Sequence, residues 1–203
     1  MELTQNPSVL ELVRKTAELT TPKEIVWIDG SEAQLESLRK IAVETGELIK
    51  LNEEKLPGCY LNRSDVNDVA RVEGRTFICS RTREEAGPTN NWMDPDEMKA
   101  KLHEILRCAM AGRTMYVIPY SMGVIGSPFA KYGIEVTDSI YVVLNMAIMT
   151  RIGTKVLDAL GDSSDVILGV HSKVTLDPEN RYIVHFPEEN KIISVNSNYG
   201  GNV

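Results

Sequence analysis

Two arginines lie around a glycine in the segment 68–76, directly before an apolar stretch. Arg71 and Arg75 are separated by three residues, and Gly74 would let this loop open and close. A guanidinium group is a planar fork of donors that can pair with two oxygens of a carboxylate or phosphate at once. The segment is therefore a candidate anion-binding loop. The alternative is a solvated turn in which Glu73 neutralises Arg75.

The segment 196–203 has a second pattern that could bind an anion. The consecutive residues Gly200 and Gly201 can present backbone N–H groups as an anion-binding nest. Tyr199 could hold a carboxylate against the positive edge of its ring. The alternative is a frayed and disordered tail.

A third glycine-containing segment, residues 120–128, follows an apolar strand, which is where α/β proteins often bind ligands. Gly123 and Gly126 could bring the backbone close to a ligand or to another segment. They could equally form a tight structural turn, and their spacing alone does not distinguish these two possibilities.

Several common kinds of site are not indicated. The sequence has no phosphate loop of the G-x-x-x-x-G-K-[ST] type, and no Cys or His pair has metal-ligand spacing. We expect His103 on the solvated surface of a helix and His185 in cross-strand packing, while His171 stands apart from both.

Strands and helices alternate along the chain, and the predicted fold class is α/β, with a mixed twisted sheet flanked by helices. Helices are predicted after caps at Asn6, Ser31, Asp94 and either Asp138 or Ser139, with a short helical turn over residues 64–69. The third of these should run along an apolar face until Gly112, and the fourth should cover residues 142–160. Strands are predicted over 24–28, 48–51, 76–79, 114–120 and 166–170, and an antiparallel hairpin over 182–186 and 191–195. In this interpretation residues 121–129 form a loop and Val136 begins the turn into the fourth helix.

Composition and charge narrow the class of protein. Of 203 residues, 42% are hydrophobic and 25% charged, which is typical of a soluble globular chain. The net charge of −7 argues against nucleic acid as a partner, and no apolar run approaches a membrane span. The start does not resemble a signal peptide. Three widely spaced cysteines argue against a disulfide framework, so we expect a cytoplasmic protein without membrane association: Cys59, Cys79 and Cys108.

Several motifs, taken together, resemble one family. The runs 109–123, 87–93 and 199–202 closely resemble stretches of GTP-dependent phosphoenolpyruvate carboxykinases, and shorter matches begin at Asp138 and Met149. Their order and spacing agree from about residue 10 to the last residue. The chain is therefore identified as similar to the amino-terminal domain of that family, over residues 1–203.

The resemblance implies an enzyme of gluconeogenesis that converts oxaloacetate and GTP to phosphoenolpyruvate, GDP and CO2. It implies substrate-binding roles for Arg71, Tyr199, Gly200 and Gly201, whereas residues 121–128 would be supporting structure. Family members use Mn²⁺ and Mg²⁺ with GTP. The resemblance assigns these to a carboxyl-terminal part of the enzyme, so we expect none to be bound by residues of this chain and name no catalytic residue in it.

The chain is accordingly expected to be a fragment, inactive alone, whose partners are oxaloacetate or phosphoenolpyruvate and the carboxyl-terminal part of the same enzyme. The full enzyme would be a monomer, and the fragment could self-associate through surface that the missing part covers. One alternative is a stand-alone, non-catalytic module that binds a dicarboxylate or phosphoenolpyruvate. Another is a small lyase that uses Arg71 and Tyr199 without metal, for which no proton donor or electron sink is evident.

Overall fold

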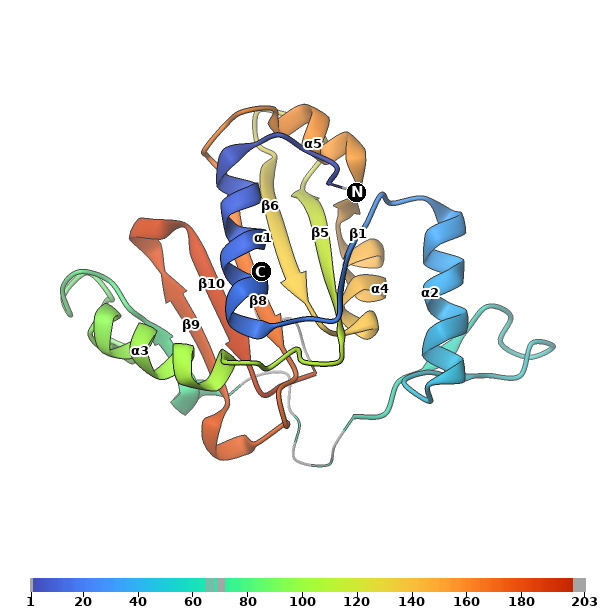
Figure 1. Cartoon of the computed structure of the whole chain (residues 1–203), viewed down its shortest axis with the longest axis horizontal. Coiled ribbons are helices and arrows are strands. Elements are labelled where there is room, and N and C mark those ends of the chain that lie inside the picture. The colour runs from blue at the N-terminus through green and yellow to red at the C-terminus, as the bar shows by residue number, and fades with distance from the viewer. Residues whose placement is uncertain (1, 65, 67, 69–71, 199–203) are drawn as a thin grey trace.

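A mixed sheet runs through the centre of the molecule, with helices on both faces (Figure 1). The computed structural model describes residues 2–64, 66, 68 and 72–198. The strands of this sheet are, in spatial order, β1 (Glu24–Trp27), β5 (Thr114–Met122), β6 (Lys131–Thr137), β8 (Ile167–Ser172), β10 (Lys191–Val195), β9 (Tyr182–Phe186) and β4 (Thr76–Ile78), with β7 (Arg151–Ile152) beside the end of β5. A separate small hairpin pairs β2 (Ile49–Lys50) with β3 (Tyr60–Leu61).

The direction of the strands decides which loops meet. Strands β6, β8 and β10 are mutually parallel, while β5 is antiparallel to β6 and β9 is antiparallel to β10. The carboxyl ends of β6, β8 and β10 therefore share one edge of the sheet with the starts of β5 and β9. Strand β4 is parallel to β9 and also begins at this edge, with Thr76 opposite Ile183. We call this the polar edge, for the residues described below.

Two apolar clusters hold the helices on the sheet. On one face, α1 (Pro7–Thr20), α3 (Pro95–Leu106) and α5 (Thr154–Leu160) pack on side chains such as Val117 and Val184. On the other face, α2 (Glu32–Glu44) and α4 (Ile140–Met149) pack on Tyr116, Ile118 and Tyr120. Figure 1 shows α1 in front of the sheet and α4 behind it. Three short 3₁₀ helices complete the structure: η1 (Glu73–Arg75), η2 (Pro178–Asn180) and η3 (Pro187–Glu189).

The helix starts follow the predicted caps. Asn6 and Asp94 accept hydrogen bonds from backbone N–H groups of the first turn, and a proline occupies the first helical position in both α1 and α3. Ser139, rather than Asp138, caps α4. Ser31 caps α2, but Gln34 Oε1 accepts from the backbone of Asp29 at 2.9 Å, which is not the reciprocal bond of a capping box.

The main error of the sequence prediction lies between residues 129 and 142. Val136 does not begin a turn, because residues 131–137 form β6, a central strand. The predicted helix over 142–160 is two helices, α4 and α5, separated by β7 and by Gly153 with φ of 105°. Helix α3 ends at Leu106 rather than at Gly112, and the strand predicted over 48–51 is the two-residue β2.

Candidate functional site

Polar residues follow the ends of three neighbouring parallel strands at the polar edge. Asp138 and Ser139 follow β6, Lys173 follows β8, and the segment 196–198 follows β10. In open α/β sheets, ligands bind outside the carboxyl ends of parallel strands. Among the described residues this edge is therefore the best candidate for the functional site.

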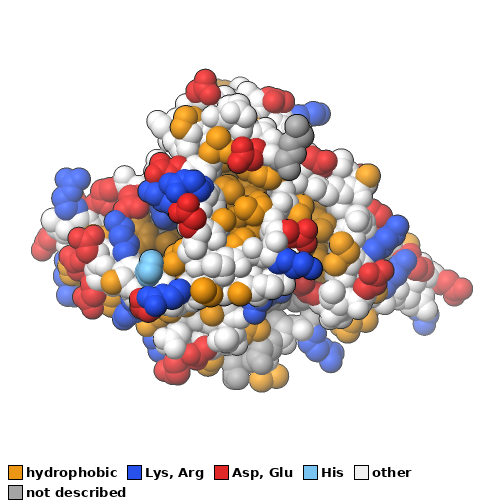
Figure 2. All heavy atoms as spheres, viewed as in Figure 1, with side chains coloured by type: hydrophobic (Ala, Val, Ile, Leu, Met, Phe, Trp, Pro, Cys, Tyr) orange, Lys and Arg blue, Asp and Glu red, His pale blue; other side chains and the backbone are white. Residues whose placement is uncertain are grey.

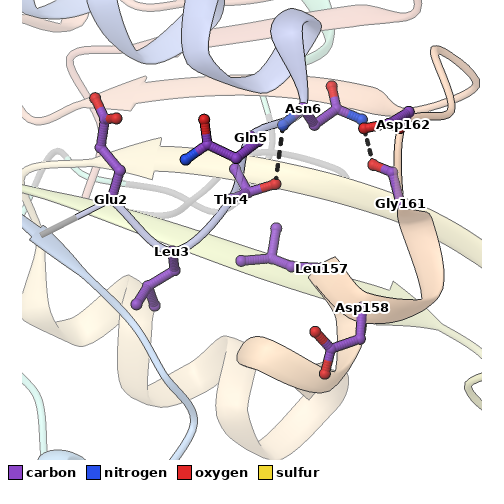
Figure 3. A pocket seen from close by; sticks show the side chains of 9 residues that line it. All are labelled: Glu2, Leu3, Thr4, Gln5, Asn6, Leu157, Asp158, Gly161 and Asp162. Carbon is purple, nitrogen blue, oxygen red and sulfur yellow. Dashed lines mark hydrogen bonds between the residues drawn. The ribbon is translucent and has the colours of Figure 1, made fainter.

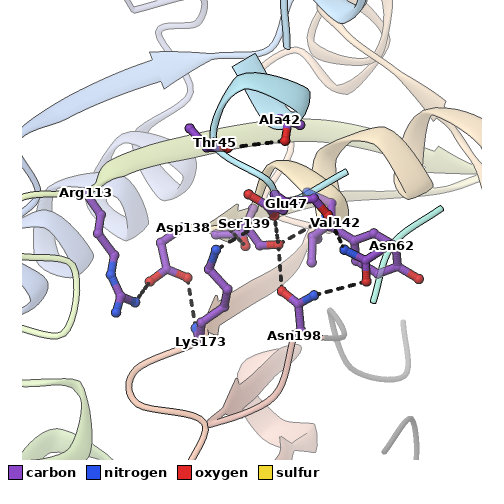
Figure 4. A network of polar contacts seen from close by, with 12 residues as sticks. Ala42, Thr45, Glu47, Asn62, Arg113, Asp138, Ser139, Val142, Lys173 and Asn198 are labelled. Atoms are coloured by element: carbon purple, nitrogen blue, oxygen red, sulfur yellow. Dashed lines mark hydrogen bonds and ion pairs between the residues drawn. The ribbon is translucent and has the colours of Figure 1, made fainter. Parts of the chain in front are cut away.

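Asp138 joins the ends of β6 and β8 to the start of β5 (Figure 4). Its buried carboxylate accepts from Arg113 Nη1 at 2.7 Å, from Ser172 Oγ at 3.1 Å and from the backbone N–H of Lys173 at 2.9 Å. Arg113 also donates to the carbonyl of Val174 at 2.7 Å. Because a buried carboxylate needs several donors, this arrangement fixes the three strand ends relative to one another.

Glu47 and Asn198 meet at the start of α4 (Figure 4). Glu47 Oε1 accepts from the backbone N–H of Tyr141 at 3.0 Å and lies 3.8 Å from Lys173 Nζ. The hydroxyl of Ser139 is within reach of both Glu47 Oε1, at 3.1 Å, and Asn198 Oδ1, at 3.3 Å. One proton serves one acceptor at a time. The residue before Tyr199 is thus held against the start of a helix.

A directional chain of hydrogen bonds passes through His171, which is fully buried. Its Nε2 lies 2.7 Å from the carbonyl of Ser197, an acceptor only, so Nε2 carries the proton. Its Nδ1 then accepts from Thr137 Oγ1 at 2.7 Å, and that hydroxyl accepts from Ser139 N–H at 3.1 Å. Burial lowers the pKa of His171, in agreement with a neutral ring. The ring therefore connects the ends of β6, β8 and β10 and has no free nitrogen for a metal ion.

Asn196 turns the chain out of β10. Its φ of 61° is left-handed, a conformation that Asn tolerates better than most residues. Its side-chain oxygen accepts from the backbone N–H groups of Thr175 and Asp177 at 3.2 and 3.1 Å. Its carbonyl accepts from Arg181 Nε at 2.9 Å. The exit of β10 is thus fixed by partners in the connection 173–181 between β8 and β9.

Asp68 joins this edge from a distant part of the sequence. Its side chain is buried, and its two oxygens accept from Ser197 Oγ and from the backbone N–H of Asn198, each at 2.9 Å. Arg181 Nη2 lies 3.7 Å from Asp68 Oδ1. The segment before Arg71 and the segment before Tyr199 are therefore in direct contact.

Several cations of the polar edge are paired with carboxylates. Four cations each lie beside a carboxylate: Arg113 beside Asp138, Lys173 beside Glu47, Arg181 beside Asp68 and Arg75 beside Glu179. Additional positive charge for an anionic ligand would have to come from residues other than these four.

The four residues predicted to bind substrate, Arg71, Tyr199, Gly200 and Gly201, lie outside the described residues, as does part of the helical turn predicted over 64–69. Residues next to them do lie at the polar edge: Asp68 and Asn198 touch, and β4 begins at Thr76.

The alternative interpretation of segment 68–76, a solvated turn in which Glu73 neutralises Arg75, is wrong in one detail. Arg75 does not pair with Glu73. It pairs with Glu179 at 3.2 Å, donates to the Tyr182 hydroxyl at 3.1 Å and stacks over the Tyr182 ring. Gly74 lies within η1.

The loop after β5 lies at the opposite edge of the sheet, because β5 is antiparallel to β6. Gly123 and Gly126 are therefore remote from the ends of β6, β8 and β10. A hollow of about 390 Å³ between the N-terminal segment and α5 also lies near that opposite edge (Figure 3). Its charged lining residues are acidic, namely Glu2, Asp158 and Asp162, which disfavours an anionic ligand.

The remaining histidines and cysteines behave as structural residues. His103 is exposed on α3, as predicted, and His185 is half-buried in β9, where burial lowers its pKa. The three cysteines are free, and burial raises the pKa of Cys79 to about 11. Across the described ranges, no group of three or more His, Cys, Asp and Glu side chains could hold a metal ion. Of the described helices, none is long and apolar enough to cross a bilayer.

Sequence reasoning did not identify Glu47, Asp68, His171 or Asn198 as site residues. Two of them could have been found from their positions in the sequence, because Asn198 follows a predicted strand and His171 lies just past one. Glu47 and Asp68 gave no such signal, because their contacts join residues 94 and 130 positions apart.

Comparison with known proteins places the chain in a family. The family model for the phosphoenolpyruvate carboxykinase N-terminal domain matches residues 11–203. Proteins named phosphoenolpyruvate carboxykinase [GTP] are similar to it. The protein of Anaeromyxobacter dehalogenans (strain 2CP-C) is 53% identical over 199 residues, and that of Neocallimastix frontalis is 50% identical over 209 residues. These alignments cover 98% and 97% of this chain but 33% and 34% of the relatives, so the chain spans about a third of their length. On this match the chain belongs to the phosphoenolpyruvate carboxykinase N-terminal domain family.

Proposed function

We propose that this chain is the substrate-binding part of a cytoplasmic, GTP-dependent phosphoenolpyruvate carboxykinase, which converts oxaloacetate and GTP to phosphoenolpyruvate, GDP and CO2 in gluconeogenesis. The observation that carries the proposal is the contact of Asp68 with Ser197 and Asn198. It joins the described neighbours of the two anion-binding segments indicated by the sequence. The names of the relatives support the same assignment.

In the proposed site, the Arg71 guanidinium contacts the anionic groups of the substrate, and Tyr199, Gly200 and Gly201 hold its carboxylate end. These residue types suit the reaction. The substrate carries at least two negative charges, and its decarboxylation leaves an enolate that needs donors and exclusion of water. Four cations of the polar edge are already paired with carboxylates, and in this proposal Arg71 supplies further positive charge for an anionic substrate.

The described residues do not fit the metal ions of the family. They contain no group of three or more ligating side chains, and both nitrogens of His171 are in hydrogen bonds. We therefore assign Mn²⁺, Mg²⁺ and GTP to the carboxyl-terminal part of the parent enzyme. The 203-residue chain alone should then have no carboxykinase activity.

The test compares the complete gene product with the 203-residue chain. With Mn²⁺, GDP, bicarbonate and phosphoenolpyruvate, the complete product should form oxaloacetate, measured by coupled reduction to malate, and the chain should not. Arg71→Ala in the complete product should raise KM for phosphoenolpyruvate or abolish turnover. Lys131→Ala, at the opposite edge, is the control and should change neither.

Calorimetric titration of oxalate into the 203-residue chain distinguishes the proposed function from the alternative of a stand-alone binding module. If the complete product is inactive and the chain binds oxalate in an Arg71-dependent way, the chain is a stand-alone binding module and the proposed enzyme function is wrong.

A further inference from the structure

Helices cover the two faces of the sheet unequally. On the face that carries α1, side chains of β8, β10, β9 and β4 belong to the apolar cluster that α1 and α3 complete, among them Leu168, Ile193, Val184 and Phe77. On the face that carries α4, the apolar cluster includes side chains of β5 but none of β8, β10, β9 or β4. Figure 1 shows α4 behind β5 and α2 beyond β1, both away from β10 and β9. Among the described residues, this part of the α4 face therefore has no helix packed on it.

Strand pairing brings four side chains together on this uncovered part of the sheet. Ile192 of β10 lies opposite both Gly169 of β8 and His185 of β9, and His185 lies opposite Ile78 of β4. Because directly paired residues point to the same face of a sheet, these side chains form one row. Ile167, two positions before Gly169, points the same way. We call Ile78, Ile167, His185 and Ile192 the open face, since all four are partly exposed.

A hollow beside the open face is lined by polar groups that lack partners. Tyr120, Glu135 and Ser194 line it together with Ile167 and Ile192. The hydroxyls of Tyr120 and Ser194 are buried, and neither has a hydrogen-bond partner within the described ranges. Glu135 is 3% exposed and likewise makes no hydrogen bond there. Since buried polar groups in native proteins are almost always hydrogen-bonded, a segment that covers this face should bring a polar side chain to the hollow.

The chemistry of the open face suits an apolar partner. Three of its four residues are isoleucines, and burial lowers the pKa of the fourth, His185, which favours the neutral ring. Burial also raises the pKa of Glu135 in the adjoining hollow, which favours the neutral carboxyl group. An apolar surface gains free energy when another apolar surface removes it from water. The partner should therefore be apolar where it meets the isoleucines and polar only beside the hollow.

The direction of the strands and the length of the relatives indicate which partner this is. Strands β6, β8 and β10 are mutually parallel, and parallel strands are normally buried on both faces by helices that run back across the sheet. The α1 face of β10 is already covered. The chain matches an N-terminal domain and spans about a third of its relatives' length, so a complete gene product of that length has further sequence to supply a helix.

We propose that, in the complete gene product, an amphipathic helix from the sequence after residue 203 packs on the open face. It would run roughly antiparallel to β10, with its apolar side on Ile167 and Ile192 and one hydrogen-bonding side chain in the hollow beside Glu135. The inference rests on the uncovered face and on the length of the relatives, and it does not depend on the proposed reaction.

The first experiment compares thiol modification in the complete gene product and in the 203-residue chain, each carrying Ile192→Cys. Reaction with a maleimide is read at position 192 by mass spectrometry, so other cysteines do not interfere. If a helix covers the open face, position 192 should react more slowly in the complete product than in the chain, by about tenfold or more. His103→Cys, at an exposed position of α3, is the control and should react equally in the two proteins.

A photochemical cross-link then identifies what covers the open face. The complete product with Ile192→p-benzoylphenylalanine is irradiated and digested, and the cross-linked peptide is sequenced. We expect a peptide from the sequence after residue 203 of the same molecule, with apolar residues at the spacing of an amphipathic helix. Neither measurement needs enzymatic activity. An inactive product would therefore contradict the proposed function and leave this inference standing.

Three results would overturn the proposal. Equal modification of position 192 in the two proteins would mean that the open face stays uncovered. A cross-link between two molecules would make the occupant a second copy of the protein. A cross-link confined to residues 1–203, or to a segment without the helical spacing of apolar residues, would assign the cover to another part of the polypeptide.

Discussion

Glu135 is an acidic residue in a buried, central position of the sheet. It lies in the middle of β6 and is 3% exposed, with no hydrogen bond or ion pair among the described residues. A Cβ added at Gly169, its neighbour on β8, would lie 1.9 Å from Glu135 Oε2. The carboxyl group therefore occupies space that only glycine leaves open. It lies beside Tyr120, whose buried hydroxyl also has no hydrogen-bond partner within the described part of the chain. Burial raises the pKa of Glu135 well above its usual value.

This pKa shift predicts how stability depends on pH. Above about pH 4.5 the unfolded chain releases the Glu135 proton, whereas the native state keeps it, so the native state binds more protons. The free energy of unfolding should fall as pH rises through this range, by up to about 1.4 kcal/mol per pH unit for one proton. Glu135→Gln should remove this slope and be more stable than wild type at pH 8, but not at pH 4.

Urea unfolding at pH 4, 6 and 8 measures the Glu135 effect. Glu84→Gln, at an exposed position, is the control and should leave the pH dependence unchanged. Equal destabilisation of Glu135→Gln at all three pH values would show that the native carboxyl is ionised and paired, against the expectation.

At the scale of elements, the fold brings polar groups together by aligning the ends of strands. The carboxyl ends of β6, β8 and β10 are in register, and His171 spans them with one bond to Thr137 and one to Ser197. Since the ring is neutral and both nitrogens are used, its role is to hold the strand ends. The polar edge is thus organised before any ligand binds.

Thr137→Val tests this role of the strand ends. Valine matches the shape of threonine but cannot donate to His171 Nδ1 or accept from Ser139 N–H. Two buried groups lose their partner, at about 1–3 kcal/mol each, so we expect the free energy of unfolding to fall by about 2–6 kcal/mol. Thr114→Val, whose hydroxyl bonds the exposed Glu24, should cost less than about 1 kcal/mol in the same urea titration. Equal losses of unfolding free energy in the two variants would contradict the role assigned to the hydrogen bonds through His171.

The sequence predicted the elements whose signals are local. Capping residues and prolines located α1 and α3, and the connection 187–190 located the β9–β10 hairpin. Strand β6 was missed because its face toward Tyr120 and Gly169 carries Gly133 and Glu135, residues typical of a solvated turn. The substrate-binding residues, predicted from residue types and from the family resemblance, lie outside the described residues and stay a prediction. The buried network around them depends on contacts such as Asp68 with Asn198, 130 positions apart, which leave no trace in local patterns.

At the scale of the whole molecule, charged side chains are dispersed over the surface, whereas exposed hydrophobic side chains are clustered. Figure 2 shows acidic and basic side chains intermingled over the face toward the viewer, while hydrophobic side chains gather near its centre, over the strands beside α1. A further group of exposed apolar residues lies at the edge opposite the polar edge. Val124 and Phe129 are 65% and 89% exposed in the loop after β5, and Ile148 and Met149 are 81% and 67% exposed at the end of α4. We call these four residues the apolar corner.

The apolar corner predicts how the chain behaves alone. Its two segments are joined by the pairing of β7 with β5, where Arg151 lies opposite Ser121, so the four side chains belong to one region of the surface. Exposed apolar groups of this size favour association, and the chain spans only about a third of its relatives' length. We therefore expect concentration-dependent self-association of the chain in sedimentation velocity, while the complete gene product stays monomeric.

The double variant Phe129→Ser/Ile148→Ser tests whether the apolar corner is responsible for this association. It should weaken the self-association of the chain at least tenfold, and substitutions at such exposed sites should change stability by less than about 0.5 kcal/mol. Ile49→Ser is the matched control, since Ile49 is 50% exposed but belongs to the separate β2–β3 hairpin. If the chain sediments as a monomer at high concentration, the exposed apolar corner does not cause self-association and the prediction is wrong. If association persists in the double variant but is lost in Ile49→Ser, the chains associate through the small hairpin and not through the apolar corner. The surface expected to contact the rest of the enzyme would then be the hairpin as well.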